Sequence, residues 1–225
     1  MPRTQYTCYW GNVSFYNENP ESAVFPTPTI GMLGLIEDID KRMTAPLKAV
    51  GDDVYLLTPA AWLHKNAIDG SEYLSWIHKK TAGDVPHFEL EEEVAVQEAL
   101  YTLIQQGVVK SAHDVSDGGL AVCLAESVIF SDGLGLNISL DATDIRLDAL
   151  LFGEAQSRIV FTAAPDDRVK IEGQLAALGV QAHKLGTVTA GGLAIHYNGT
   201  PLIDLDASAL ETPYESAIPS LMAGN

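Results

Sequence analysis

Apolar and polar positions follow a regular pattern mainly in the second half of the chain. Over residues 89–106, apolar residues recur at helical spacing, behind an acidic first turn and ahead of Gly107. Similar patterns predict helices at 119–130, 145–151 and 166–178, a final helix ending near residue 222, and strands at 108–115, 136–140, 158–163, 181–188, 193–197 and 202–205. This alternation predicts the α/β class, with helices layered on a sheet.

The first 80 residues are less regular. Strands are predicted at 5–16, where Tyr6, Cys8 and Trp10 alternate, at 29–36 as a buried apolar run, and at 54–57, followed by a short helix at 70–79. These three strands have no helix of useful length between them, so they resemble the end of a sheet whose beginning is missing. We therefore expect the strands before residue 60 to lack pairing partners and to leave an edge prone to association.

The composition limits the classes of protein to which the chain can belong. The 225 residues are 47% hydrophobic, enough to bury a core without disulfides. Cys8 and Cys123 have no metal-ligand spacing, so we expect a reducing compartment and two small buried apolar side chains. There is no secretory signal, and no apolar run approaches the ~18 residues of a membrane span, which together predict a cytoplasmic protein.

The formal net charge is −17. Such a charge disfavours nucleic acid and anionic lipid as partners. It leaves open a small anionic ligand, because backbone donors and a divalent cation act locally. The acidic run Glu89–Glu93 is predicted to be a solvated first helical turn.

Three short segments carry candidate chemistry, and the first is Gly11-Asn12-Val13-Ser14. A glycine allows a ligand to approach the backbone, an asparagine carbonyl can bind Mg²⁺, and Ser14 offers a donor and an acceptor. These residues suit a phosphate, a hard cation and a polar substrate group that meet in one place. The alternative is a polar transition from a strand to a turn.

The second segment runs from His113 to Leu120. Asp114, Asp117, Gly118 and Gly119 lie between a strand end and a helix start, where amides can bind an anion and a cation can bridge it to carboxylates. The alternative is an aspartate N-cap followed by a glycine turn. His113 is predicted to be a hydrogen-bonded core histidine.

The third segment is Gly153–Arg158, ahead of an apolar strand. Here Glu154, Gln156 and Arg158 alternate, which places them on one polar face if the segment is extended. The alternative is an edge strand whose polar face is solvated.

These segments, together with Gly11–Glu18, Pro26–Gly31 and Gly70–Leu74, resemble the phosphoribosylformylglycinamidine synthase family in the same order. The resemblance covers about residues 11–222 and places the chain in the aminoimidazole ribonucleotide synthase superfamily. It is strongest to the short, multi-subunit form, the PurL type. It implies the truncated end of an ATP-binding N-terminal-type domain at 1–60, a connecting segment at 61–80 and a complete C-terminal-type α/β domain at 81–225.

The resemblance also implies a reaction. The family is an ATP-dependent carbon–nitrogen ligase of purine biosynthesis that converts formylglycinamide ribonucleotide, with ammonia derived from glutamine, to formylglycinamidine ribonucleotide, ADP and phosphate. ATP and Mg²⁺ are the implied cofactors. The implied partners are the missing N-terminal half, the PurQ glutaminase and PurS.

Residue roles follow from the resemblance alone. Gly11 would contact ATP, Asn12 would bind Mg²⁺ and Ser14 would contact the ribonucleotide, while Asp114, Asp117, Gly118 and Gly119 match an auxiliary nucleotide site. The family's general acid–base histidine and Mg²⁺ carboxylates lie in the absent first module, so this chain would hold no catalytic residue and the fragment would be inactive alone. The alternative function is a non-catalytic scaffold that binds a structural nucleotide or partner subunits.

Overall fold

The computed structural model describes residues 20–23, 31, 33–59, 68–141 and 143–224. Contacts divide the chain into two units, Met1–Glu37 and Asp38–Asn225. The strand predicted at 29–36 is wrong where the structure describes it, because residues 33–36 form no strand and Leu33 and Leu35 are exposed. An apolar run becomes a strand when a neighbouring strand pairs with it, and hydrophobicity alone does not supply that neighbour.

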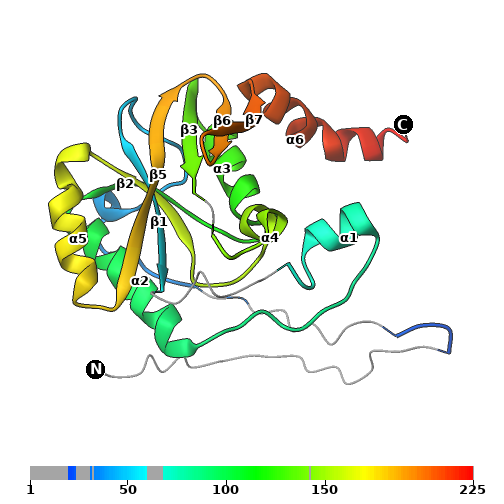
Figure 1. Ribbon diagram of the computed structural model, residues 1–225, viewed down its shortest axis with the longest axis horizontal. Helices are drawn as coiled ribbons and strands as arrows, with labels where there is room; N and C mark the ends of the chain where they lie inside the picture. The colour runs from blue at the N-terminus through cyan, green and yellow to red at the C-terminus, as the bar shows by residue number, and fades with distance from the viewer. Residues whose placement is uncertain (1–19, 24–30, 32, 60–67, 142, 225) are drawn as a thin grey trace. The chain divides into compact units, whose positions relative to one another are not determined.

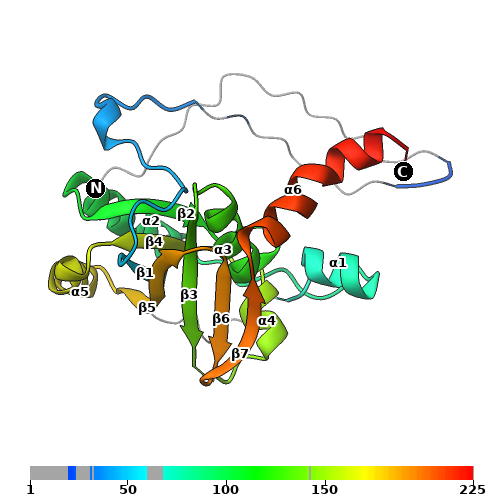
Figure 2. The ribbon, with the colours of Figure 1, turned by 90° about the horizontal axis from the view of Figure 1, so that it is seen from above.

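The second unit is built on one seven-stranded sheet in the order β2-β4-β1-β5-β3-β6-β7. Neighbouring strands are antiparallel except for the parallel pair β3 and β6, which Figure 2 shows side by side with β7. The strands are β1 (Asp53–Pro59), β2 (Val109–Asp114), β3 (Leu134–Leu140), β4 (Ile159–Ala163), β5 (Val180–Ala190), β6 (Leu193–Tyr197) and β7 (Thr200–Leu205).

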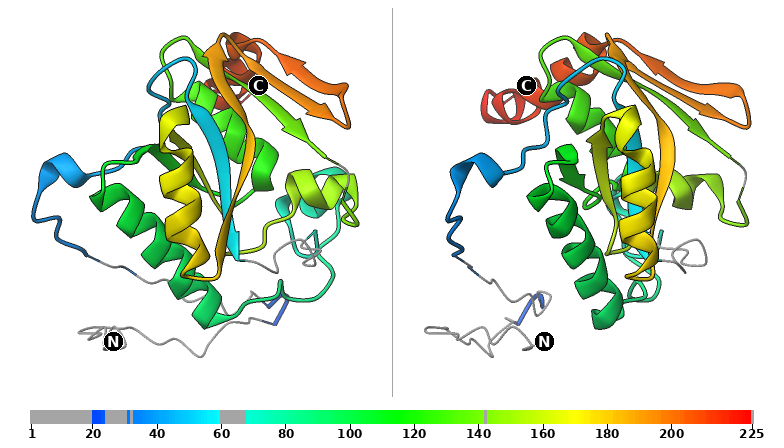
Figure 3. Two further views of the ribbon diagram at one scale, coloured as in Figure 1. Left: turned by 60° about the vertical axis from the view of Figure 1, so that its left-hand side comes forward. Right: turned by 90° about the vertical axis from the view of Figure 1, so that its left-hand side faces the viewer.

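Helices cover both faces of this sheet, as Figures 1 and 3 show. Those with hydrophobic residues in the two core clusters are α1 (Glu72–His78), α2 (Leu90–Gln105), α3 (Gly119–Ile129), α4 (Leu147–Phe152), α5 (Arg168–Ala176) and α6 (Ala207–Met222). Helices α2 and α5 pack on one face, and α3 and α4 pack on the other. The α/β class predicted from the sequence is therefore confirmed.

Strand β1 lies in the middle of the sheet and corrects one prediction. Its register pairs it with β4 on one side and β5 on the other, so the strand predicted at 54–57 has both partners. Val54 and Leu56 face α3 and α4, while Tyr55 and Leu57 face α2 and α5. Each fully buried side chain of this size contributes about 1.5–3 kcal/mol. The strand therefore belongs to the same layered unit as the strands after residue 100, and the expected unpaired edge is absent at β1.

The other elements of this unit agree with the sequence pattern. The helices predicted at 70–79, 89–106, 119–130, 145–151 and 166–178, and the strands predicted from 108 onward, all occur with small shifts at their ends. None of the helices in the described part of the chain is long and apolar enough to cross a membrane.

Candidate functional site

A pocket of about 890 Å³ opens at the end of β2, where the sequence predicted an anion site. Five parts of the second unit form it: the loop before α1, the loop before α2, the first turns of α2, the turn between β2 and α3, and the segment that leads into β4. The pocket thus brings together two of the predicted segments, because Asp114 and Asp117 line it together with Glu154, Gln156 and Arg158.

The turn between β2 and α3 depends on two glycines. Gly118 and Gly119 have φ angles of 81° and 72°, a region that L side chains rarely adopt. The amide of Gly118 donates to Glu154 Oε1 at 2.8 Å, and the amide of Gly119 donates to the carbonyl of Ser116 at 3.0 Å. Both glycine amides that were predicted to bind an anion are therefore hydrogen-bonded within the chain.

The segment Gly153–Arg158 is an irregular loop, so the prediction of an extended strand with one polar face is wrong. Ser157 has a φ of 62°, which interrupts the alternation of side chains. Arg158 is 5% exposed and turns back on its own loop, where Nε donates to the carbonyl of Ala155 at 2.9 Å and Nη2 to that of Gly153 at 2.6 Å. Burial lowers the pKa of Arg158 to about 10.

The pocket is strongly acidic. Its carboxylates are Asp69, Asp84, Glu93, Asp114, Asp117 and Glu154. Arg158 is the one basic residue among the described lining residues, and two of its donors already bind carbonyls. Such a pocket favours a cation, or an anion whose charge a divalent cation offsets.

Three of these carboxylates were missed by the sequence analysis. Glu93 was expected to be solvated, but it lines the pocket and accepts from Ser157 Oγ at 2.6 Å across 64 positions of sequence. Asp69 and Asp84 lie on loops with no recognisable motif. No local sequence pattern predicts that these three residues line the pocket, because only the tertiary fold brings them there.

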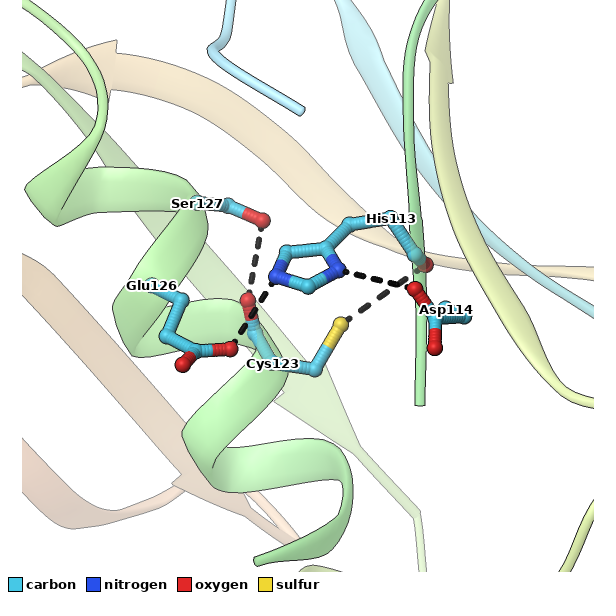
Figure 4. A network of polar contacts seen from close by, with 5 residues as sticks. All are labelled: His113, Asp114, Cys123, Glu126 and Ser127. Carbon is cyan, nitrogen blue, oxygen red and sulfur yellow. Dashed lines mark hydrogen bonds and ion pairs between the residues drawn. The ribbon is translucent and has the colours of Figure 1, made fainter. Parts of the chain in front are cut away.

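His113 lies beside the pocket, at the end of β2, in a polar network (Figure 4). Its Nε2 lies 3.0 Å from Glu126 Oε2 of α3 and its Nδ1 lies 3.5 Å from Asp114 Oδ1. The side chain is 14% exposed and its ring stacks on Phe130. The prediction of a hydrogen-bonded core histidine is confirmed, and the network ties Asp114 to α3.

Cys123 completes this network from the buried side of α3. Its Sγ lies 3.8 Å from the carbonyl of His113, and Ser127 Oγ donates to the carbonyl of Cys123 at 2.9 Å. Burial is the largest of the effects that raise the pKa of the Cys123 thiol well above its usual range. The prediction that Cys123 is a small buried residue is confirmed, and Cys8 lies outside the described residues.

The other predicted ligand residues, Gly11, Asn12 and Ser14, also lie outside the described residues. Within the part of the chain that the structure describes, no three His, Cys, Asp or Glu side chains are grouped closely enough to hold a metal ion.

Comparison with known proteins gives relatives of high similarity. The chain is 58% identical over 211 residues to the phosphoribosylformylglycinamidine synthase subunit PurL of Salinibacter ruber. This match covers 93% of the chain and 28% of the relative. The chain therefore spans a little over a quarter of the length of the curated relatives that it matches.

Solved structures share the fold. PurL of Thermotoga maritima complexed with FGAR has a TM-score of 0.64 at 17% identity, covering 77% of this chain and 30% of that one. The PurLQS structure from the same organism has a TM-score of 0.61 at 16% identity, covering 77% and 28%. The family model "AIR synthase related protein, C-terminal domain" matches residues 49–198. This match spans more than half of the chain, which therefore belongs to the AIR synthase related family.

Proposed function

We propose that this chain forms part of an ATP-dependent formylglycinamidine ribonucleotide synthase. The observation that carries the proposal is the 58% identity to a PurL subunit over 93% of the chain. The complete enzyme would use ATP to activate the amide oxygen of formylglycinamide ribonucleotide, and ammonia derived from glutamine would then displace phosphate. The chain would act in the cytoplasm, with PurQ and PurS as partners. The PurLQS structure of Thermotoga maritima, which shares the fold, supports that assembly.

In this proposal Gly11 contacts ATP, Asn12 binds Mg²⁺ and Ser14 contacts the ribonucleotide substrate. Residues up to about 60 would be the end of an ATP-binding domain, except that β1 joins the sheet of the C-terminal-type domain. The groups that move protons would lie in the part of the longer relatives that this chain does not span. The isolated chain should therefore release no ADP in repeated turnovers.

The acidic pocket is the proposed auxiliary nucleotide site. Its volume of about 890 Å³ accommodates a nucleotide, and Asp114 and Asp117 offer carboxylates. Magnesium is commonly held by one or two carboxylates together with substrate phosphates, so these residues fit a Mg²⁺-bound nucleotide. The amides of Gly118 and Gly119 fit a phosphate less well, because both already have acceptors within the chain.

Calorimetric titration of the chain with Mg-ADP tests this site. The proposal expects saturable binding that Asp117→Ala weakens at least about tenfold and that omission of Mg²⁺ abolishes. Asp166→Ala is the matched control, since Asp166 is exposed, carries the same charge and does not line the pocket. No heat at millimolar Mg-ADP would favour the alternative of a scaffold that binds partner subunits, and equal affinities for the two variants would contradict a role of Asp117 in the site.

A further inference from the structure

We propose that Glu154 is a positioning residue that holds the outer wall of the acidic pocket against its inner wall. It does so through two hydrogen bonds to backbone amides, which are together called the Glu154 clip. The outer wall is defined here as residues 68–88, which include α1 and the loop after it. The inner wall is defined as residues 114–119 and 153–159, at the ends of β2 and the start of β4.

The geometry of the clip is specific. One carboxylate oxygen, Glu154 Oε1, accepts from the amide of Glu72 at 2.9 Å and from the amide of Gly118 at 2.8 Å. Glu72 is the first residue of α1, and Gly118 is the N-cap of α3. A carboxylate is well suited to this place, because unpaired amides and the helix dipole at a helix start both favour negative charge.

The outer wall is anchored in the core at Ile68, whereas α1 after it packs only partly on the body of the unit. Helix α1 has no fully buried residue, and Trp76 and Ile77 are 69% and 64% exposed. Tyr73 stacks on Phe152 with ring centroids 4.9 Å apart, two residues before Glu154. The Glu154 clip, the Tyr73–Phe152 stack and the packing of Leu74 on the core therefore attach α1 near its N-terminus.

The outer wall is, in contrast, held together internally. The amide of Gly70 donates to the carbonyl of Ala82 at 3.0 Å, and Ser71 caps α1 through Leu74. Asp69 and Asp84 on this wall face the same pocket as Asp114 and Asp117 on the other. Loss of the clip should thus loosen α1 and the loop after it, while Ile68 stays in the core, and shift Asp84 relative to Asp114 and Asp117.

Hydrogen exchange of the 225-residue chain tests the clip directly. In Glu154→Ala, exchange across residues 70–78 and at Gly118 should accelerate at least about tenfold, while β1 stays protected. Glu154→Asp keeps the charge but shortens the reach, so it should resemble alanine. Glu154→Gln keeps an acceptor oxygen and should stay within about threefold of the parent. Glu172→Ala, on α5, is the control for loss of a carboxylate.

Mg-ADP affinity supplies a second readout, which rests on the proposed function. Affinity should fall about tenfold in Glu154→Ala and Glu154→Asp, and Glu154→Gln should restore it. Unchanged exchange at 70–78 in Glu154→Ala, equal behaviour of the alanine and glutamine variants, or tighter binding by Glu154→Ala would overturn the inference. Tighter binding would mean that Glu154 occupies the place of the ligand's anion. If the parent chain binds no Mg-ADP, the nucleotide site is wrong, and the exchange data still decide the role of Glu154.

Discussion

Gly119 of α3 lies so close to Phe152 of α4 that a Cβ at residue 119 would stand 2.7 Å from the Phe152 carbonyl carbon. The same Cβ would lie 2.7 Å from the carbonyl oxygen of Gly153. Glycine at this position therefore lets the start of α3 pack against the end of α4, next to the loop that carries Glu154.

Gly119→Ala should accordingly lower the free energy of unfolding by about 2–4 kcal/mol, because it combines a positive φ with a backbone clash. Gly173→Ala is the control, since Gly173 lies inside α5 with nothing within 4 Å of its added Cβ, and it should stabilise by about 0.5–1 kcal/mol. Urea unfolding measures both. A neutral Gly119→Ala variant would contradict the packing described here.

Arg158 should matter for stability through its hydrogen bonds. Arg158→Met leaves the buried carbonyls of Gly153 and Ala155 without their donors, at a cost of about 2–4 kcal/mol in urea unfolding. Arg158→Lys should recover little, because an ammonium lacks the fork that reaches both oxygens. Arg168→Met, at an exposed ion pair with Glu172, should change stability by less than about 1 kcal/mol. Similar losses for Arg158→Met and Arg168→Met would argue against this role.

Tyr55 gives a prediction in alkaline solution. Its side chain is 2% exposed and its hydroxyl donates to Asp53 at 3.2 Å, and burial, with Asp53, raises the pKa of Tyr55 to about 12. The unfolded chain loses this proton near pH 10, and the folded chain holds it until near pH 12. Tyr55 therefore leaves the free energy of unfolding unchanged below pH 10. Between pH 10 and pH 12 the free energy of unfolding falls, by at most about 3 kcal/mol.

The measurement compares Tyr55→Phe with the parent chain from pH 8 to pH 12. The stability of the parent should decline more steeply above pH 10 than that of the variant, since phenylalanine has no proton to lose. Parallel curves across this range would show that Tyr55 ionises equally in both states.

Cys123 should be an inert thiol in the folded protein. In a Cys8→Ser background, alkylation by iodoacetamide at pH 8 should be at least about a hundredfold slower in buffer than in 6 M urea, because the thiolate is disfavoured by burial. Mass spectrometry of the Cys123 peptide gives both rates. Comparable rates would mean that α3 opens readily or that the thiol is accessible.

The layered fold could be predicted from the sequence because each element from α2 onward has a clear period and a clear end. The 16-residue helix α2 and the strand β3 show this directly. Strand β1 was recognised, but its place between β4 and β5 was not. Its neighbours lie more than 100 residues away in sequence, so no local pattern identifies them.

The candidate site was predicted in part. Asp114 ends a strand and Asp117 precedes a helix, and this local arrangement did point to the pocket. The hydrogen bond from Gly118 to Glu154 joins residues 36 positions apart, and the hydrogen bond from Ser157 to Glu93 joins residues 64 positions apart. Neither could be predicted, because tertiary packing alone brings these segments together. The irregular loop before β4 could not be predicted, because Glu154, Gln156 and Arg158 alternate in sequence as they would in a strand. The positive φ of Ser157 interrupts this alternation in the structure.

The most direct test of the proposed function is a chimera in which this chain replaces the matching region of the Salinibacter ruber relative. The two sequences are 58% identical there, so the chimera should fold. With formylglycinamide ribonucleotide, ATP, Mg²⁺ and ammonia, it should release ADP within about tenfold of the parent relative's rate, while this chain alone releases none. A folded chimera without substrate-dependent ADP release, beside an active parent, would contradict the proposal.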